Sequence, residues 1–331
     1  MLFLVPHLFP SARLLEAAAQ DLHLPALQTL LARGTRQACP ATGVEAAVCE
    51  ALGIERQQDW PIAPVTLAAD GGVAGDAYCL RADPVHLRVM RDRIVLADSS
   101  TLALSQQEAS ALADAIRQHF GDSLSPTPLT PTRWYVRFPH PPRLTTTPPS
   151  LANGCDIDPL LPRGADAMRF RAQLNELQML LHEHPVNLAR EAHGALPVNS
   201  VWLWGGGTLP AVPQKRIALY ARGESIRALG AFCKADLFPL PDRLEEGMLE
   251  RDGVTVLDAL TTAGQDGDPY GWREALRTLE ARWFAPLLTM LRTRGSGLRL
   301  ADPISGKSLR AQKTDVWKIW RRPRSLMSLL G

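Results

Sequence analysis

The stretch His184-Pro-Val-Asn-Leu-Ala-Arg-Glu-Ala-His-Gly-Ala-Leu-Pro-Val-Asn-Ser-Val-Trp-Leu-Trp-Gly-Gly-Gly-Thr-Leu-Pro210 decides how the chain is interpreted. Its run from Val198 to Trp204 is apolar and rich in β-branched and aromatic residues, which predicts a buried strand. The three glycines at 205–207 should then end that strand in a turn. Glycine-rich turns after strands free main-chain N–H groups that can face a phosphate or a carboxylate. The stretch therefore predicts either an anion site or simply a buried strand and a tight turn.

Composition describes a globular protein with room for one large or two ordinary domains. The 331 residues are 46% hydrophobic and 21% charged, with a net charge of +2, which gives no whole-chain signal for nucleic acid or membrane. No apolar run approaches 18 residues, so we expect no membrane-spanning helix. The opening Met-Leu-Phe-Leu-Val5 favours a first core strand over a signal peptide. Five scattered cysteines without a Cys-x-x-Cys pair favour reduced thiols and a cytoplasmic location.

Hydrophobic periodicity divides the chain into alternating strands and helices. Trp60–Pro64 is expected to be a proline-flanked link, and Ser105-Gln-Gln-Glu108 a capping box that opens a helix. This alternation predicts an α/β architecture with parallel pairing in its main sheet. The predicted helices are 11–20, 25–33, 44–52, 105–120, 166–183, 224–232 and 272–294, and the predicted strands are 2–5, 65–68, 77–81, 85–90, 94–97, 134–138, 198–204, 216–220, 254–257 and 298–300.

Four arginines gather in the segment that should form two short strands around Ala82-Asp83-Pro84. They are Arg81, Arg88, Arg91 and Arg93, and Asp83 and His86 lie among them. Guanidinium groups bind carboxylate and phosphate through bidentate hydrogen bonds, so these four arginines predict an anion clamp. The same pattern also suits the solvated face of an antiparallel sheet.

The histidines do not form a recognisable metal site. His182 and His184 are two residues apart, whereas a helical metal pair needs a spacing of four, and His193 is the last histidine in the chain. The sequence contains no His-Glu-x-x-His, Gly-x-Ser-x-Gly, Walker A or Gly-x-Gly-x-x-Gly motif. It therefore gives little support to a metal-assisted hydrolase, and we predict no metal and no cofactor.

The C-terminal segment 307–324 is strongly basic. It contains seven Lys and Arg residues against one acid, Asp315, and it includes Trp317 and Trp320. Cationic and aromatic side chains together can bind the backbone and bases of a nucleic acid. A solvated basic surface is the alternative.

In motif order, the chain resembles the archaeal-type cofactor-independent phosphoglycerate mutases of the alkaline phosphatase superfamily. The resemblance is carried by Leu24-Pro-Ala-Leu-Gln-Thr-Leu-Leu-Ala-Arg-Gly34 and by the segment beginning at Arg81. Its most specific part is His184-Pro-Val-Asn187 with Arg190, Gly194, Pro197, Asn199 and Trp202–Gly207. Ala82-Asp-Pro-Val-His-Leu-Arg88 and the same later stretch are also similar to the bacterial RpfE-type regulatory proteins.

The departures from the mutase pattern concern its catalytic half. Val5-Pro6-His7 stands where that family has a metal-binding Asp after its first strand, and Thr42-Gly-Val44 stands where it has a Ser nucleophile. The family's later His ligands have no counterpart after His193. The resemblance thus implies a relative that keeps substrate binding and lacks the parts needed for phosphoryl transfer.

The resemblance implies a reduced, doubly wound alkaline-phosphatase-like core, residues 1–60 and 255–331, with an inserted α/β substrate-type domain, 61–254. We expect a non-catalytic regulatory protein that binds a small phosphorylated or anionic metabolite; the alternatives are an active mutase or phosphatase with replaced metal ligands and a nucleic-acid-associated protein. The predicted ligand-binding residues are Arg81, Asp83, His86, Arg91, Arg93, His184, Asn187, Arg190, Asn199, Gly205, Gly206 and Gly207.

Overall fold

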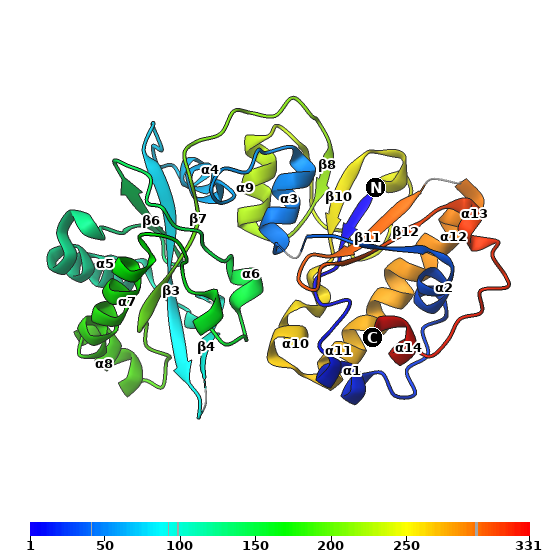
Figure 1. The fold of residues 1–331 in the computed structure, drawn as a ribbon, viewed down its shortest axis with the longest axis horizontal. Helices are drawn as coiled ribbons and strands as arrows, with labels where there is room; N and C mark the ends of the chain where they lie inside the picture. Colours follow the sequence, from blue (N-terminus) through cyan, green and yellow to red (C-terminus); the bar gives the residue numbers. More distant parts are fainter. Residues whose placement is uncertain (41, 92, 98, 295–296) are drawn as a thin grey trace. The chain divides into compact units, whose positions relative to one another are not determined.

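The computed structural model of the protein describes residues 1–40, 42–91, 93–97, 99–294 and 297–331 (Figure 1). The chain divides into two compact units: unit 1 contains residues 1–52 and 213–331, and unit 2 contains residues 53–212. Unit 2 is thus an insertion in unit 1. The strands between residues 212 and 254 join the sheet of unit 1.

The described part of unit 1 contains a seven-stranded sheet in the order β2-β12-β11-β1-β10-β8-β9. The five strands from β11 to β9 are parallel, whereas β12 and β2 add antiparallel pairs at one edge. Parallel neighbours must be joined by crossover connections, and these are what the alternation of strands and helices in the sequence predicts. The strands are β1 (Leu2–Leu4), β2 (Thr35–Ala38), β8 (Ala218–Tyr220), β9 (Asp236–Phe238), β10 (Gly253–Val256), β11 (Leu298–Asp302) and β12 (Lys307–Ala311).

Helices cover both faces of this sheet. Phe3 and Val5 point into a core with α1, α2, α11, α12 and α14, whereas Leu219 packs against Gly230 of α9 on the other face. Successive strand residues point to opposite faces, so one short strand can serve both cores. The helices are α1 (Ala12–Ala18), α2 (Pro25–Arg33), α3 (Val44–Leu52), α9 (Glu224–Phe232), α10 (Thr261–Asp266), α11 (Pro269–Leu279), α12 (Ala285–Arg294), α13 (Lys313–Val316) and α14 (Leu326–Leu330).

The long helix predicted from residue 272 onward changes its winding in the middle. A π-helical segment, Glu280–Phe284, joins α11 to α12 ahead of Pro286. Within it the buried Glu280 carboxylate accepts hydrogen bonds from the main-chain N–H groups of Ala26 (2.6 Å) and Leu27 (3.0 Å). A carboxylate from a distant segment therefore caps the N-terminus of α2, where the helix dipole favours negative charge.

Unit 2 is built around the long strand β3 (Tyr78–Val89), which pairs with three others in antiparallel fashion. Its neighbours are β4 (Ile94–Ala97), β6 (Arg133–Phe138) and β7 (Ser200–Gly207), and β5 (Thr127–Thr130) pairs with β6. The helices of this unit are α4 (Ile62–Ala69), α5 (Gln106–Phe120), α6 (Pro149–Ala152), α7 (Ala167–His182) and α8 (Pro185–Ala192). The sheet and the helices α5 and α7 share one apolar core, which contains Trp134, Phe170 and Leu177.

Two local predictions in unit 2 were wrong. Residues 65–68 belong to the buried helix α4 rather than to a strand, and Pro61 and Pro64 are tolerated because they lie at its cap and first turn. The two strands predicted around Ala82-Asp-Pro84 form one continuous strand. Pro84 fits because it lies between the part of β3 that pairs with β6 (78–81) and the part that pairs with β4 (86–89). Pro185–Ala192, for which the sequence pattern predicts neither helix nor strand, is α8.

The predicted class is confirmed: a doubly wound α/β core with a parallel central sheet carries an inserted domain with an antiparallel sheet. Across the described residues, no helix is both long enough and apolar enough to cross a membrane.

Candidate functional site

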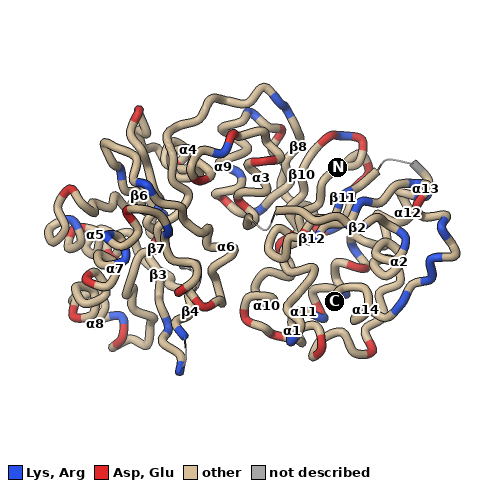
Figure 2. The backbone as a smooth tube through the Cα atoms, in the orientation of Figure 1, with Lys and Arg blue, Asp and Glu red and all other residues tan. Residues whose placement is uncertain are grey.

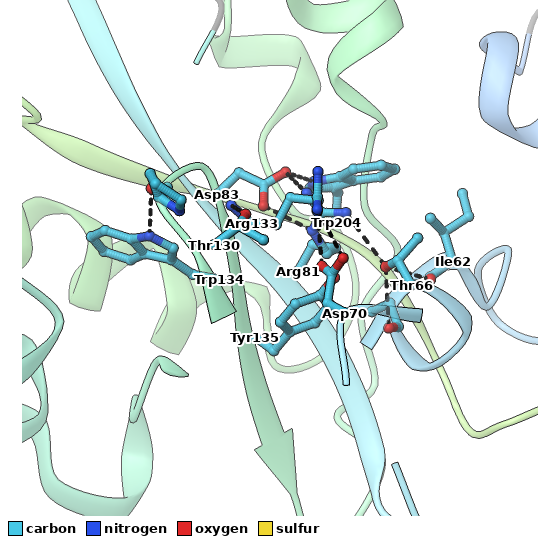
Figure 3. Close-up of polar contacts among 12 residues, drawn as sticks. Ile62, Thr66, Asp70, Arg81, Asp83, Thr130, Arg133, Trp134, Tyr135 and Trp204 are labelled. Carbon is cyan, nitrogen blue, oxygen red and sulfur yellow. Dashed lines mark hydrogen bonds and ion pairs between the residues drawn. The ribbon is translucent and has the colours of Figure 1, made fainter. Parts of the chain in front are cut away.

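A buried cluster of charged and aromatic side chains lies in unit 2, at the first of the predicted arginines (Figure 3). Arg81 and Asp83 are two residues apart on β3 and therefore share one face of the strand. The Arg81 Nε and Nη2 atoms donate to the two Asp83 carboxylate oxygens at 2.8 and 2.9 Å. Both residues are almost fully buried, with 2% and 4% of their surface exposed. This bidentate geometry is the strongest form of arginine–carboxylate ion pair.

Aromatic side chains enclose this pair. The Arg81 guanidinium carbon lies 5.3 Å from the ring centroid of Tyr135 and 5.2 Å from that of Trp204. The Trp204 indole N–H donates to Asp83 at 2.8 Å, and Arg81 Nη1 donates to the Thr66 hydroxyl at 3.4 Å. All three guanidinium nitrogens of Arg81 therefore already have protein acceptors.

A second ion pair extends the cluster. Arg133 donates from Nε and Nη2 to Asp70, both at 2.8 Å, and the Tyr135 hydroxyl donates to Asp70 at 2.5 Å. Partial burial alone would raise the pKa of the Asp70 carboxyl, but the hydrogen bonds from Arg133 and Tyr135 and the cationic charges outweigh it and lower that pKa. Burial raises the pKa of the Asp83 carboxyl, and the positive charge of Arg81 partly opposes this increase.

This cluster is balanced in charge, with two arginines facing two aspartates. An incoming anion would have to displace Asp83 from Arg81 before it could use that guanidinium, and leaving a buried carboxylate without its partner is strongly unfavourable. The geometry therefore favours a structural role for Arg81 and Asp83, which join α4, β3, β6 and β7.

Asn187 and Arg190 of α8 have main-chain partners. The Asn187 amide donates to the carbonyl oxygens of Leu181 (2.7 Å) and Val198 (2.8 Å) and accepts from the Val198 N–H (2.9 Å). Arg190 donates to the Leu196 carbonyl at 2.9 Å, to Glu108 at 2.9 Å and to the Leu102 carbonyl. Both side chains are buried, and their bonds tie α8 to the segments around it.

His184, Asn199 and His86 also bond within the protein. His184 is the N-cap of α8, and its Nδ1 atom accepts from the Val186 N–H at 3.2 Å. The Asn199 side-chain amide accepts from the Leu87 N–H at 2.7 Å and donates to the Leu87 carbonyl at 2.9 Å, and so extends the hydrogen-bond ladder between β7 and β3. His86 Nδ1 donates to the carbonyl oxygen of residue 197 at 2.9 Å.

The prediction of a glycine turn after residue 204 was wrong, because Gly205, Gly206 and Gly207 are the buried end of strand β7. A Cβ atom on Gly206 would lie 2.2 Å from the Tyr78 hydroxyl, and one on Gly207 would lie 2.6 Å from Pro61 Cβ. Gly205 has φ +68° at a bulge in the pairing with β3, and its N–H donates to the Thr146 hydroxyl at 3.1 Å. The glycines serve close packing in a strand.

The remaining predicted arginines, Arg91 and Arg93, are exposed at the β3–β4 connection, together with Arg88. The connection is tight, since the Met90 N–H donates to the Arg93 carbonyl at 2.8 Å. Blue segments mark this end of the hairpin in Figure 2. These three arginines are separated from Arg81, which lies in the buried half of the same strand, so the four do not form one clamp.

Sequence reasoning missed a polar group at the carboxyl end of the parallel strands in unit 1. The Asp302 carboxylate, at the end of β11, is fully buried and accepts from the main-chain N–H groups of His7 (3.2 Å), Phe9 (3.0 Å), Ile304 (3.0 Å) and Ser305 (3.4 Å). Burial lowers the pKa of His7, which follows β1 with φ +60°. The signal was available: each of the two residues lies two positions after a predicted strand, at the strand end where α/β proteins place their sites.

The His7 Nε2 atom and the Ser305 hydroxyl are buried and have no hydrogen-bond partner among the described residues. Within the same described ranges, no group of three or more His, Cys, Asp or Glu side chains is arranged to hold a metal ion.

No family model matches the chain. It is 29% identical over 163 residues to the 2,3-bisphosphoglycerate-independent phosphoglycerate mutase of Methanosarcina mazei, an alignment that covers 43% of this chain and 41% of that protein. The probable enzyme of the same name from Geobacter sulfurreducens is 26% identical over 266 residues, covering 73% of this chain and 66% of that protein. The chain is therefore similar to 2,3-bisphosphoglycerate-independent phosphoglycerate mutases at modest identity.

The chain spans about two fifths of the length of the Methanosarcina relative. Among solved structures, it is similar to the cofactor-independent phosphoglycerate mutase from Thermoplasma acidophilum, with a TM-score of 0.47 and 19% identity over 100% of this chain and 94% of that one. It is also similar to the PH0037 protein from Pyrococcus horikoshii, with a TM-score of 0.49 and 14% identity over 94% and 86% of the two chains.

Proposed function

We propose that this phosphoglycerate-mutase-like protein binds a small phosphorylated metabolite in a regulatory role and does not transfer its phosphoryl group. The similarity to phosphoglycerate mutases supports the class of ligand, a phosphorylated hydroxy acid such as 3-phosphoglycerate. The RpfE-type sequence signatures support the regulatory role.

The exposed arginine group at the β3–β4 connection carries the ligand part of the proposal. Arg88, Arg91 and Arg93 lie within six residues and face solvent, whereas Arg81 and Arg190 are held by Asp83 and Glu108. Guanidinium groups at such a site can form paired hydrogen bonds with phosphate and carboxylate at little desolvation cost. An anionic metabolite would bind there by complementary charge.

The carboxyl edge of the parallel sheet supports the absence of phosphoryl transfer. Asp302 stands there with both carboxylate oxygens bonded to main-chain N–H groups, so it holds the loops of residues 7–9 and 304–305 in place. Burial lowers the pKa of the neighbouring His7. The Asp302 carboxylate maintains the shape of the edge through its four main-chain bonds and is not free to activate a nucleophile in this arrangement.

Calorimetric titration with 3-phosphoglycerate tests the binding. We expect saturable binding that the double variant R91Q/R93Q weakens by about tenfold, the loss of one or two charge-assisted contacts. The matched control is R117Q/R169Q, which removes two exposed arginines from α5 and α7 of the same unit. Equal affinity in the two double variants, or no binding to the native protein, would overturn the ligand assignment.

A turnover assay tests the proposed absence of phosphoryl transfer. The native protein is incubated with 3-phosphoglycerate and Mn²⁺, and 2-phosphoglycerate is measured with and without EDTA. We expect no conversion above the protein-free rate. Conversion that EDTA abolishes would overturn the non-catalytic role and establish an active mutase, whatever the outcome of the binding experiment.

A further inference from the structure

Large apolar side chains are exposed in the segment that links α13 to α14. Trp317, Ile319 and Trp320 have 64%, 68% and 73% of their surface in solvent. Single exposed apolar residues need no explanation, but three within four residues, two of them tryptophan, mark a binding surface.

The same segment is strongly cationic. It contains Lys318, Arg321, Arg322 and Arg324, and Figure 2 shows blue stretches along the connection between α13 and α14. The acid of this segment, Asp315, is buried and bonded to Lys318 at 2.7 Å. The charge that faces solvent is therefore positive throughout.

The arginines line a hollow rather than a flat surface. A groove of about 640 Å³ is lined by Arg36, Arg321, Arg322, Arg324, Trp320 and Ser328; we call it the arginine groove. Arg36 comes from β2, far away in the sequence, and donates to the Leu329 carbonyl of α14, which fixes the wall opposite the linking segment. Among the described residues, the side chains of Arg322 and Arg324 form no hydrogen bond or ion pair.

We propose that the arginine groove binds single-stranded nucleic acid. Guanidinium groups pair with successive phosphates, and an exposed indole is a platform on which any base can stack. A positively charged groove with an aromatic side chain beside it is the form in which proteins bind single strands without sequence preference. The proposal is independent of the metabolite site, which lies in unit 2.

The test uses full-length protein and fluorescein-labelled dT15 and rU15 in fluorescence anisotropy. We expect binding whose affinity falls with salt, with a slope of roughly −3 in a double-logarithmic plot if four arginines contact phosphates. The variant R321Q/R322Q/R324Q should bind at least about tenfold more weakly, with a slope near −1. Trp320→Ala should weaken binding by about tenfold through lost stacking, and Trp317→Ala, outside the groove, by less than twofold.

The matched control is K215Q/R216Q/R222Q, which removes three exposed cations near β8 and leaves the groove intact. Unchanged affinity in that control, with loss in the groove variant, supports the proposal, provided that both melt like the native protein in circular dichroism. Equal loss in both triple variants would indicate nonspecific charge attraction and overturn it. So would the absence of oligonucleotide binding at low salt, or binding only to vesicles that contain phosphatidylserine.

Discussion

Replacing Arg81 by Met distinguishes a structural ion pair from a ligand contact. The change keeps the length of the side chain but leaves Asp83 buried with the Trp204 N–H as its remaining side-chain donor. Breaking a buried pair by removing one partner costs about 3–5 kcal/mol. The lost contacts with the Tyr135 and Trp204 rings add roughly 0.5–2 kcal/mol. We therefore expect R81M to lower the free energy of unfolding by about 5 kcal/mol.

Urea unfolding followed by circular dichroism and tryptophan fluorescence measures this loss, with the transitions of the two units fitted separately. The control is R81M/D83L, which removes both charges. It should cost less than R81M alone, because no unpaired carboxylate is left in the core. A cost below about 1 kcal/mol for R81M would refute the reasoning, as would unchanged stability with a large loss of affinity for 3-phosphoglycerate.

Three further predictions follow from single side chains. Because the pKa of His7 is lowered in the folded state, the unfolded state takes up a proton at this residue first as the pH falls below about 6.5. The free energy of unfolding should therefore decrease below that pH. In urea titrations at several pH values, His7→Asn should weaken this pH dependence, since Asn tolerates the positive φ of this position. Gly206→Ala should lower the free energy of unfolding by about 1–3 kcal/mol, and adding Tyr78→Phe should partly restore it. The control is Gly297→Ala, where an added Cβ would have no neighbour nearer than 3.7 Å; equal costs for the two glycine changes contradict the packing argument. Ellman's reagent should label Cys155 first, because this cysteine is exposed. Its labelling should become faster as the pH rises, because partial burial raises the pKa of the thiol and the thiolate is the reactive form. A fast phase that persists in Cys155→Ser contradicts this assignment.

Strong local signals made much of the fold predictable. The capping box at Ser105 and Glu108 is present, with hydrogen bonds in both directions, and the apolar face that predicted a helix over 166–183 corresponds to α7. Helix α4 was missed because its Val and Thr residues and flanking prolines are typical of extended chain, whereas tertiary burial decides its state.

The candidate site was harder to predict than the fold. Polar residues on a buried strand look like ligand contacts in a sequence, and only the structure reveals their partners. Arg190 is neutralised by Glu108, which is 82 residues away in the chain, and Arg81 is enclosed by aromatic rings from two other strands. Arg36 joins the arginine groove from a segment that no local pattern connects with residues 320–324.

The discontinuity of unit 1 determines the order in which the protein can be completed on the ribosome. Strand β1 pairs with β10 and β11, so Leu2 obtains its partners Val254 and Arg299 only after most of the chain has been made. At 5–20 residues per second, roughly 250 residues take about 12–50 s. Unit 2, which is continuous, can fold during that interval, while the first strand and the uncapped helix α2 wait for their partners. A nascent chain released before residue 253 would therefore carry a finished insertion and an apolar N-terminal segment without its sheet.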